Sequence, residues 1–312
     1  MRIAPHKFTV VVAMDAPIGR AMIGDSLQID VVADVGALLG EGPQWVVRDQ
    51  AMWWVDIKGR KLFRLKDGAL THWDTPMRLG SIIPREAGGF IAGTDQGIAA
   101  VDPEAGRFDI LFNPEADRAT NRFNDGKIDR EGRLWLGTMD DEESRASGAL
   151  YRVAGDLSCA RVDDGYRITN GPAFSPDGKT VYVNDSALQR TYACPMEDNG
   201  SLAGKRVLRQ FGVGEGYPDG MTVDAEGCLW IAFWGASCLR RLSPAGETLR
   251  EVRLPVSQPT SPAFGGPDLD RLYVTSARIG LSDDDLSMQP NAGALLMFDP
   301  GVAGLAERPF AG

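Results

Sequence analysis

One short pattern recurs six times along this 312-residue chain, and it limits what the chain can fold into. Each copy combines an apolar strand-like run, a tight turn and a second run of large apolar residues. The copies contain "VVRDQAMWWVDIKGRKLFRL", "IIPREAGGFIAGTDQGIAAV", "IDREGRLWLGTMDD", "FSPDGKTVYVNDSALQRTYAC", "VDAEGCLWIAFWGASCLRRL" and "FGGPDLDRLYVTSAR". Their Asp-Gly and Glu-Gly pairs are typical of two-residue hairpin turns, which need positive φ. Each copy has room for a second hairpin, so we expect three or four strands in each.

The spacing of the copies predicts the architecture. Successive copies lie about 37 to 49 residues apart, which is the range expected of propeller blades. Six copies therefore predict an all-β, six-bladed β-propeller with four-stranded blades. The preceding segment "LQIDVVADV" has no copy of its own, and we expect it to pair with the last blade around "ALLMFD" and close the ring. Two stacked β-sandwiches are the alternative, but they would not explain one repeat that persists from end to end.

The domain assignment follows from the repeat. We assign residues 26–312 to a single propeller domain and residues 1–25 to an N-terminal leader that the repeat does not explain. Met22 is an alternative start of the protein. The segment "FTVVVAM" is short and is followed by Asp15, so it is a poor signal-peptide core.

Charge and cysteine usage narrow the environment and the partners. The net charge of -10 argues against nucleic acid or an anionic membrane as partner, because both would repel the protein. No apolar run approaches the roughly 20 residues that span a bilayer. The cysteines show no C-x-x-C spacing, and we predict buried free thiols at Cys159, Cys194, Cys228 and Cys238. We expect a cytoplasmic protein that is a monomer or a weak homo-oligomer.

Scarce histidine limits the chemistry that the chain can perform. Its two histidines are His6, in the leader, and His72, in the outer part of the first copy. Neither stands beside a Gly-framed serine or a second ligand, which argues against a serine triad and a histidine-bound catalytic zinc. Phosphate-binding glycine loops are also missing from the sequence. Chemistry must therefore come from carboxylates, amides, arginine or a metal with oxygen ligands.

Polar residues precede the first apolar strand of four copies. They are Glu41 in "LGEGPQW", Arg122 and Asn124 in "NRFNDGKID", Asn170 in "ITNGPAFS" and Asp219 in "YPDGMTVD". Because the innermost strands of a propeller converge on one mouth of the channel, equivalent positions should meet there. Asn-Gly, Asn-Asp-Gly and Pro-Asp-Gly are also ordinary turn sequences, so each position alone has a purely structural explanation. Four copies that carry polar residues at one register favour a functional site.

The oxygen donors in this set suit a metal ion. Glu41, Asn170 and Asp219 offer two carboxylates and an amide oxygen, which match a hard divalent cation that retains water. Calcium, magnesium, manganese, zinc and ferrous iron all accept such ligands. Asp219 could serve both as ligand and as proton acceptor.

The same motifs resemble a known family. "GEGPQW", "NRFNDGKIDREGRLWLGTM", "ITNGPAFSPDGKTVYVNDS", "PDGMTVDAEGCLWIA" and "FGGPDLDRLYVTSAR" resemble the senescence marker protein (regucalcin), gluconolactonase and luciferin-regenerating enzyme family. The resemblance covers nearly all of the chain after the leader, and it looks closest to the bacterial sugar lactonases. It implies a six-bladed propeller that uses one divalent ion to hydrolyse aldonolactones.

The resemblance also implies roles for individual residues. Glu41, Asn170 and Asp219 match the family's metal ligands, with Asp219 also the base. Substrate contacts are implied for Arg122, Asn124 and Glu142, although the acidic neighbours of Glu142 leave that alignment open: Asp140, Asp141 and Glu143. Pro172 and Ala173 stand where regucalcin-like members carry Leu and an acid, a difference that implies a reshaped pocket.

The sequence therefore predicts metal-dependent hydrolysis of a sugar lactone, such as glucono-, xylono- or arabinonolactone, to the free sugar acid. Two alternatives stay open. The protein could be a non-enzymatic propeller that binds calcium or a partner, or a metal-dependent esterase acting on non-sugar esters. Fold does not choose among these. The sugar and the metal are not identified by the sequence.

Overall fold

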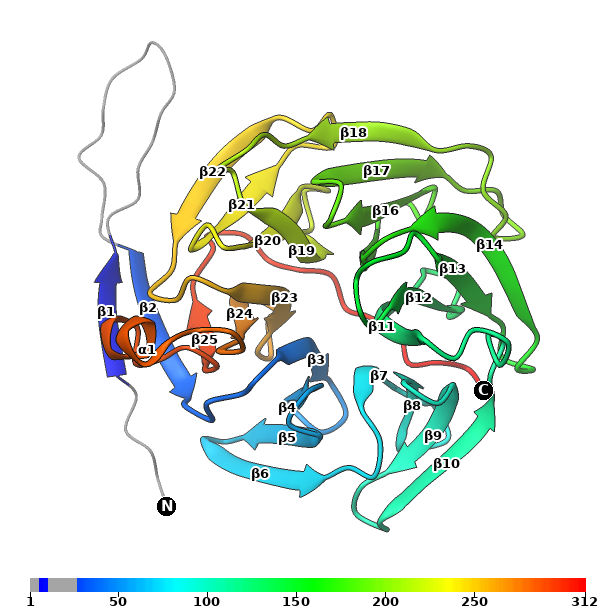
Figure 1. The fold of residues 1–312 in the computed structure, drawn as a ribbon, viewed down its shortest axis with the longest axis horizontal. Helices are drawn as coiled ribbons and strands as arrows, with labels where there is room; N and C mark the ends of the chain where they lie inside the picture. Colours follow the sequence, from blue (N-terminus) through cyan, green and yellow to red (C-terminus); the bar gives the residue numbers. More distant parts are fainter. Residues whose placement is uncertain (1–5, 11–26) are drawn as a thin grey trace.

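The computed structural model describes residues 6–10 and 27–312, which form six antiparallel sheets arranged in a ring (Figure 1). This confirms the predicted six-bladed β-propeller and excludes stacked sandwiches. Blade 1 contains β3 (Gly40–Val46), β4 (Ala51–Asp56), β5 (Lys61–Lys66) and β6 (Ala69–Asp74). Blade 2 contains β7 (Leu79–Pro84), β8 (Phe90–Thr94), β9 (Ile98–Asp102) and β10 (Arg107–Phe112). Blade 3 contains β11 (Asn121–Ile128), β12 (Leu134–Asp140), β13 (Gly148–Val153) and β14 (Cys159–Tyr166).

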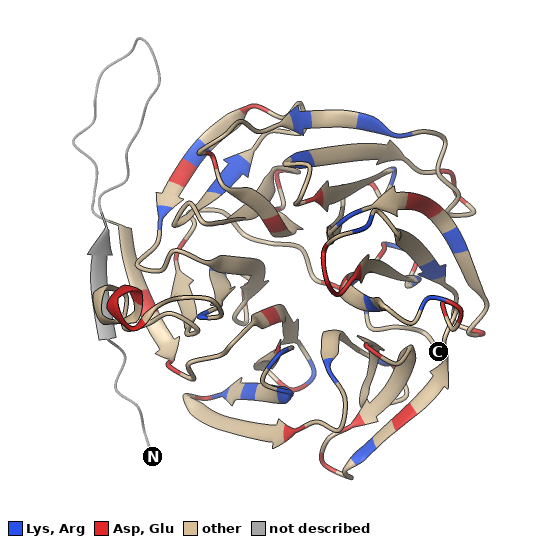
Figure 2. Cartoon of the chain, in the orientation of Figure 1, with Lys and Arg blue, Asp and Glu red and all other residues tan. Residues whose placement is uncertain are grey.

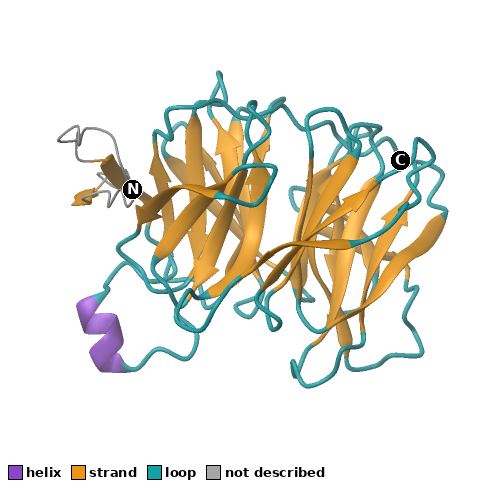
Figure 3. Cartoon of the chain, turned by 90° about the horizontal axis from the view of Figure 1, so that it is seen from above, coloured by secondary structure: helices purple, strands orange, loops and turns teal. Residues whose placement is uncertain are grey.

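The other three blades repeat this order from the channel outward. Blade 4 contains β15 (Thr169–Phe174), β16 (Thr180–Asp185), β17 (Arg190–Pro195) and β18 (Arg206–Gln210). Blade 5 contains β19 (Tyr217–Val223), β20 (Leu229–Trp234), β21 (Cys238–Leu242) and β22 (Thr248–Arg253). Blade 6 contains β23 (Pro259–Gly265), β24 (Arg271–Ser276) and β25 (Leu295–Phe298). A short helix, α1 (Asp283–Met288), lies apart from the sheets on the β24–β25 connection (Figure 3).

Blade 6 is completed by the beginning of the chain. β2 (Leu27–Ala33) pairs antiparallel with β25, so that Ile29 faces Phe298 and Val31 faces Leu296. This confirms the predicted pairing of "LQIDVVADV" with "ALLMFD". β1 (His6–Val10) adds a fifth strand outside β2. The predicted boundary at residues 25 and 26 and the alternative start at Met22 lie outside the described residues.

The hydrophobic core lies between neighbouring blades. Large buried side chains of one sheet pack on the next, as when Trp135 of blade 3 meets Phe174 of blade 4 with ring centroids 5.6 Å apart. Trp230 of blade 5 meets Phe298 of blade 6 in the same way, at 6.1 Å. All four cysteines are free, as predicted; Cys194, Cys228 and Cys238 are also buried as expected, whereas Cys159 is only half-buried. In the described part of the chain, no helix is long and apolar enough to cross a bilayer.

The repeated acidic-Gly turn is longer than expected. In blade 3 the amide of Asp129 donates to Arg133 O at 3.0 Å, which encloses three loop residues and not the predicted two. Gly132, at φ 81°, takes the left-handed position that such a loop requires. The buried Asp129 carboxylate accepts hydrogen bonds from Arg133 Nε at 2.6 Å and from Trp135 Nε1 at 2.8 Å. The acid is therefore a structural anchor that ties the turn to the following strand.

The C-terminal segment after β25 runs across the inner strands at the ends opposite to those that carry the polar residues (Figure 1). Gly304 N donates to Leu269 O of blade 6 at 2.8 Å, and Lys127 of blade 3 forms a 3.2 Å ion pair with Glu307. Phe310 is fully buried among Ile83 and other residues of blades 2 and 3. The segment thus connects blades that are remote in sequence.

We predict that this segment is an essential part of the fold. Because Phe310 is completely buried, Phe310→Ala should lower the free energy of unfolding by about 3–5 kcal/mol. Denaturant unfolding followed by tryptophan fluorescence measures this change. Val213→Ala is the matched control, since Val213 is fully exposed and its loss should change stability by less than about 0.5 kcal/mol. Equal effects of the two substitutions would show that the segment does not hold the blades together.

Candidate metal and substrate site

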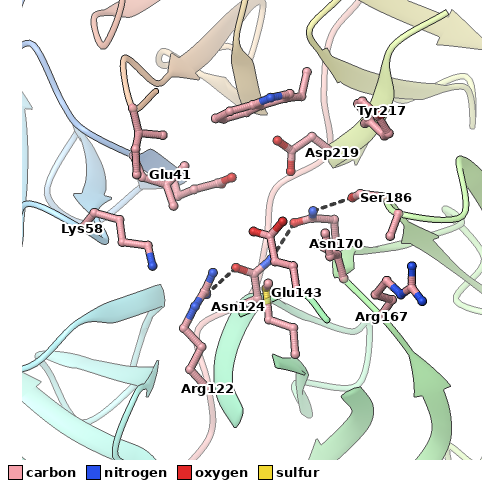
Figure 4. Close-up of a pocket in the computed structure, with 16 residues that line it drawn as sticks. Glu41, Lys58, Arg122, Asn124, Glu143, Arg167, Asn170, Ser186, Tyr217 and Asp219 are labelled. Carbon is pink, nitrogen blue, oxygen red and sulfur yellow. Dashed lines mark hydrogen bonds between the residues drawn. The ribbon is translucent and has the colours of Figure 1, made fainter. Parts of the chain in front are cut away.

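A pocket of about 470 Å³ opens where the inner strands begin (Figure 4). Five of the six residues singled out from the sequence line it, although they come from four blades and span 178 positions of the chain. They are Glu41, Arg122, Asn124, Asn170 and Asp219. The sixth, Glu142, is exposed, and its neighbour Glu143 lines the pocket. The shared register in the repeats thus corresponds to a shared place in the structure.

Each of these side chains enters the channel at an irregularity of its strand. The pairing register shifts between Glu41 and Gln44 in β3, and similar shifts occur in all five other inner strands. In β15 the shift follows Asn170 directly, and in β19 it spans Asp219. A bulge re-aims side chains without ending the sheet. The sequence placed these residues just before the first apolar strand of each copy; in the structure they are among the first four residues of the inner strands, at the strand starts.

A chain of hydrogen bonds fixes the amide groups of the site. Arg122 Nη1 donates to Asn124 Oδ1 at 2.6 Å, and Asn124 Nδ2 donates to Asn170 Oδ1 at 2.9 Å. Asn170 Nδ2 in turn donates to Ser186 Oγ at 2.8 Å (Figure 4). Ser186 Oγ itself donates to Pro218 O at 2.7 Å. Asn170 is therefore locked, with one lone pair of its amide oxygen still free for a ligand. Ser186 was missed in the sequence analysis, although it closes the quoted "YVNDS" motif.

Glu41 and Asp219 are buried carboxylates without a cationic partner. Their exposed fractions are 5% and 7%, and neither forms an ion pair with any residue that the structure describes. Glu41 Oε2 accepts only the amide of Gly42, at 3.0 Å. Burial, followed by the negative charge of Asp219, raises the pKa of Glu41 well above its usual value. Burial, followed by the charge of Asp125, raises the pKa of Asp219 in the same direction.

Asp125 is a third buried acid, whose charge raises the pKa of both Glu41 and Asp219, and it was not singled out from the sequence. It is 2% exposed, and burial raises its pKa to about 6. Its two oxygens accept the amides of Gly126 at 2.8 Å and Gly171 at 3.2 Å, which join blade 3 to blade 4. Three buried acids are thus held near one another, and the local field favours a bound cation.

The donor set fits a divalent metal ion. Across residues 6–10 and 27–312, no three histidine, cysteine or acidic side chains group closely enough to hold an ion by themselves. The candidate set is different in kind, because the carboxylates of Glu41 and Asp219 are joined by the amide oxygen of Asn170. Carboxylate and amide oxygens are ligands that hard cations such as Ca²⁺ and Mg²⁺ accept. Two carboxylates would also balance the charge of one divalent ion.

Behind two basic residues of the pocket wall, Lys58 and Arg122, Asp141 gathers three cations. Its carboxylate binds Lys58 Nζ at 3.1 Å, Arg78 Nη1 at 2.8 Å and Arg122 Nε at 2.8 Å. Partial burial raises the pKa of Asp141, but the hydrogen bonds from Arg78 and Lys58 and the charge of Arg122 hold it well below its ordinary value. Asp141 therefore stays ionised and orients Arg122 toward Asn124. The sequence analysis named Asp141 only as an acidic neighbour of Glu142 and did not predict this role.

The turn after β12 decides which glutamate faces the pocket. Glu143 N donates to Asp140 O at 2.9 Å, and Glu143 adopts φ 58°, a conformation that few residues with a side chain adopt. Both glutamates are exposed, but Glu143 lines the pocket and Glu142 does not. Backbone strain of this kind often accompanies functional sites.

Comparisons with known proteins agree with this architecture. The profile of the SMP-30/Gluconolactonase/LRE-like region matches residues 39–278. The chain is 37% identical to 6-deoxy-6-sulfogluconolactonase of Pseudomonas putida, covering 88% of this chain and 96% of that protein. It is also 37% identical to L-arabinolactonase of Azospirillum brasilense, covering 91% and 96%.

A solved structure extends the likeness to three dimensions. The calcium-binding protein regucalcin of Agrobacterium tumefaciens str. C58 superimposes with a TM-score of 0.85 at 31% identity, over 90% of this chain and 96% of that one. The resemblance carried by the five sequence motifs is thereby confirmed. The chain belongs to the SMP-30/gluconolactonase/LRE-like family.

Proposed function

We propose that the protein is a divalent-metal-dependent hydrolase that opens a sugar lactone to the free sugar acid. The observation that carries this proposal is the pair of buried, unneutralised carboxylates, Glu41 and Asp219, beside the locked amide of Asn170. The names of the two lactonase relatives support the substrate class. The pocket is large enough for a monosaccharide ring and is lined by hydrogen-bonding groups.

Glu41, Asn170 and Asp219 are the residues that would hold the metal. When bound, a divalent ion supplies Lewis-acid polarisation of an ester carbonyl and lowers the pKa of a bound water. Calcium, zinc, manganese, magnesium and ferrous iron are the candidates, because each accepts oxygen ligands.

Asp219 is the residue best placed to move the proton. A water oxygen adds to the lactone carbonyl carbon, Asp219 takes the water proton, and the bond from that carbon to the ring oxygen breaks. The ring oxygen leaves with the proton as a hydroxyl group, so the product is an open-chain sugar acid. Burial raises the pKa of Asp219 in the metal-free protein, whereas a bound cation would lower it and keep the carboxylate ionised, as a proton acceptor must be.

Arg122, Asn124 and Glu143 would orient the sugar. The Arg122 guanidinium is 5% exposed and is held by Asp141, Asn124 and the carbonyl of Phe123, so it presents the two donors of Nη2 at a fixed position. A fixed planar fork is well suited to hydroxyl and carbonyl oxygens. Glu143, in contrast to the donor Arg122, offers carboxylate oxygens that accept hydrogen bonds from sugar hydroxyl groups.

A second candidate function is metal binding without catalysis. It is favoured by the similarity to a structure described as a calcium-binding protein. Hydrolysis of sugar lactones with and without chelator separates the two functions, and aryl esters assayed in parallel test the wider esterase alternative. Elemental analysis of the purified protein, followed by the same assay with each ion, identifies the metal.

We predict that substituting the proposed metal ligands impairs metal binding and activity while the protein still folds. We expect Asp219→Asn and Glu41→Gln to weaken metal affinity and to lower kcat for lactone hydrolysis by about 10²–10⁴-fold, because each removes a ligand charge and the first removes the base. Calorimetric metal titration and a pH-stat assay measure the two effects. Asp109→Asn removes an exposed acid far from the pocket and is the control. Undiminished metal affinity and activity in the Asp219 variant would disprove the assignment.

The two adjacent glutamates provide a matched pair. Glu143→Gln should raise KM for the lactone about tenfold, because a neutral amide replaces the ionised carboxylate that accepts a hydrogen bond from the sugar. Glu142→Gln should change KM less than about twofold. Steady-state kinetics on both variants decide between them. The reverse order of effects would return the contact to Glu142, where the motif alignment placed it.

Metal-free protein should be less stable at neutral pH than at mildly acidic pH. The folded state raises the pKa of Glu41 and Asp219, so their stabilising contribution is present below the unfolded pKa of about 4 and is lost as pH rises through the folded value. In chelator at pH 7, Asp219→Asn should therefore raise the melting temperature by about 2–4 °C. With saturating cation the wild type should be the more stable of the two. Thermal unfolding under both conditions tests this, and a variant that melts lower than wild type in chelator would refute it.

A further inference from the structure

Arg167 differs from the other basic residues of the pocket. Lys58 and Arg122 both line the pocket and both bind Asp141. The Arg167 guanidinium lines it too, yet it has no hydrogen bond or ion pair with any residue that the structure describes. Figure 4 shows it on the side of the pocket away from Lys58 and Glu41. Arg167 is itself exposed, so the pocket carries a solvent-accessible cationic group without a protein partner among the described residues.

The backbone that carries Arg167 is firmly held. Arg167 N and Ile168 N donate to the two carboxylate oxygens of Asp185, at 3.1 and 3.4 Å, and Asp185 is 1% exposed. Ser186 N donates to Ile168 O at 3.0 Å. The same short connection leads into β15 and to Asn170, three residues later. Arg167 is therefore positioned relative to the proposed metal ligands and is not part of a freely moving loop.

The surroundings of Arg167 suit an anion. Ser186 and Tyr217 lie on the same side of the pocket (Figure 4), and the acids that line it do not pair with Arg167. Acidic and basic residues are interspersed around the ring (Figure 2), and the protein as a whole carries a net charge of -10. Such a protein repels anions in general, so an anionic ligand needs a specific local cation. A guanidinium with unfilled donors binds carboxylate, sulfonate and phosphate oxygens through paired hydrogen bonds.

We propose that Arg167 selects lactones that carry an anionic group at the end of the sugar remote from the lactone carbonyl. This inference rests on the proposed function, because it places the reacting carbonyl near Asn170 and Asp219. The remote group then extends toward Arg167 and Tyr217. The shared chemistry is a carboxylate, sulfonate or phosphate substituent, and the substrate set below distinguishes these sources.

The test compares neutral and anionic lactones in matched variants. D-Glucono-1,5-lactone is the neutral substrate; D-glucaro-1,4-lactone and the lactones of 6-sulfo- and 6-phosphogluconate are the anionic ones. Arg167→Gln should raise KM for at least one anionic lactone by about tenfold to a hundredfold, because a charge-assisted contact is lost. It should leave kcat, and KM for the neutral lactone, within about twofold. Arg167→Lys should recover part of the loss.

Arg206→Gln is the control for charge removal, since Arg206 is exposed on the outer strand β18. It should leave KM for every lactone unchanged. Equal effects of Arg167→Gln on neutral and anionic lactones, or no effect on either, would overturn the inference. The neutral lactone also reports on folding, because a misfolded variant would lose activity on both classes.

A binding experiment separates this inference from the proposed function. If the wild type opens none of these lactones, the proposed function fails, and calorimetric binding of glucarate and gluconate decides the role of Arg167. Tighter binding of the dianion by the wild type, lost in Arg167→Gln, would support the inference. Equal affinity for the two acids, or a preference that survives the substitution, would overturn it.

Discussion

The sixth sheet is assembled from both ends of the chain, and every other feature of the molecule depends on this closure. β2 pairs with β25, and the fully buried Ile29 and Phe298 stand opposite each other across the seam. The inner strands of blades 6 and 1 are also joined, because Thr260 Oγ1 donates to Gly40 O at 2.6 Å. Gly40 immediately precedes Glu41, so closing the ring also positions the first acid of the site. A ring left open at this seam would separate Glu41 from Asp219.

The site arises from breaks in regular pairing within a closed ring. In an undisturbed strand, side chains alternate strictly between the two faces of the sheet. The bulges of the inner strands add a residue without ending the ladder, and the polar side chain turns into the channel. Two glycines permit the close approach: Gly171 has φ 76°, and a Cβ on Gly220 would lie 2.2 Å from Ser261 Oγ. The Asn-Gly and Asp-Gly sequences thus do mark irregular backbone, as the turn interpretation implied. The same irregular backbone directs the functional side chains into the channel.

The sequence predicted the ring and the gathering of the site because both follow from period and register. One repeated strand-turn-strand unit specifies blades, and equivalent positions in equivalent blades must meet. Features set by the backbone conformation of a single residue could not be predicted from the sequence. Whether Glu142 or Glu143 faces the pocket is set by the left-handed φ of Glu143, which the run of four acids does not reveal. The length of the acidic-Gly turns likewise depends on hydrogen bonds to Asp129 that appear only in the folded chain.

Ion pairs between side chains of different blades also could not be predicted from the sequence. Asp141 takes its three cations from three blades, and Arg167 is distinguished only by lacking such a partner among the described residues. Charged residues of either kind look alike in a linear sequence, because pairing depends on distances between remote segments. The composition gave a net charge for the whole protein, whereas the pocket depends on how individual charges are neutralised.

Rigidity explains how the pocket can hold several like charges together. Glu41, Asp125 and Asp219 repel one another, and burial removes the water that would otherwise screen them. On a loose loop such acids would move apart until the repulsion was relieved. Here each stands on an inner strand that is paired along its outer side and packed against its neighbours in the ring. The folded state therefore retains an unfavourable arrangement that the proposed cation would relieve, and the affinity for that ion would come from stability that the rest of the propeller supplies.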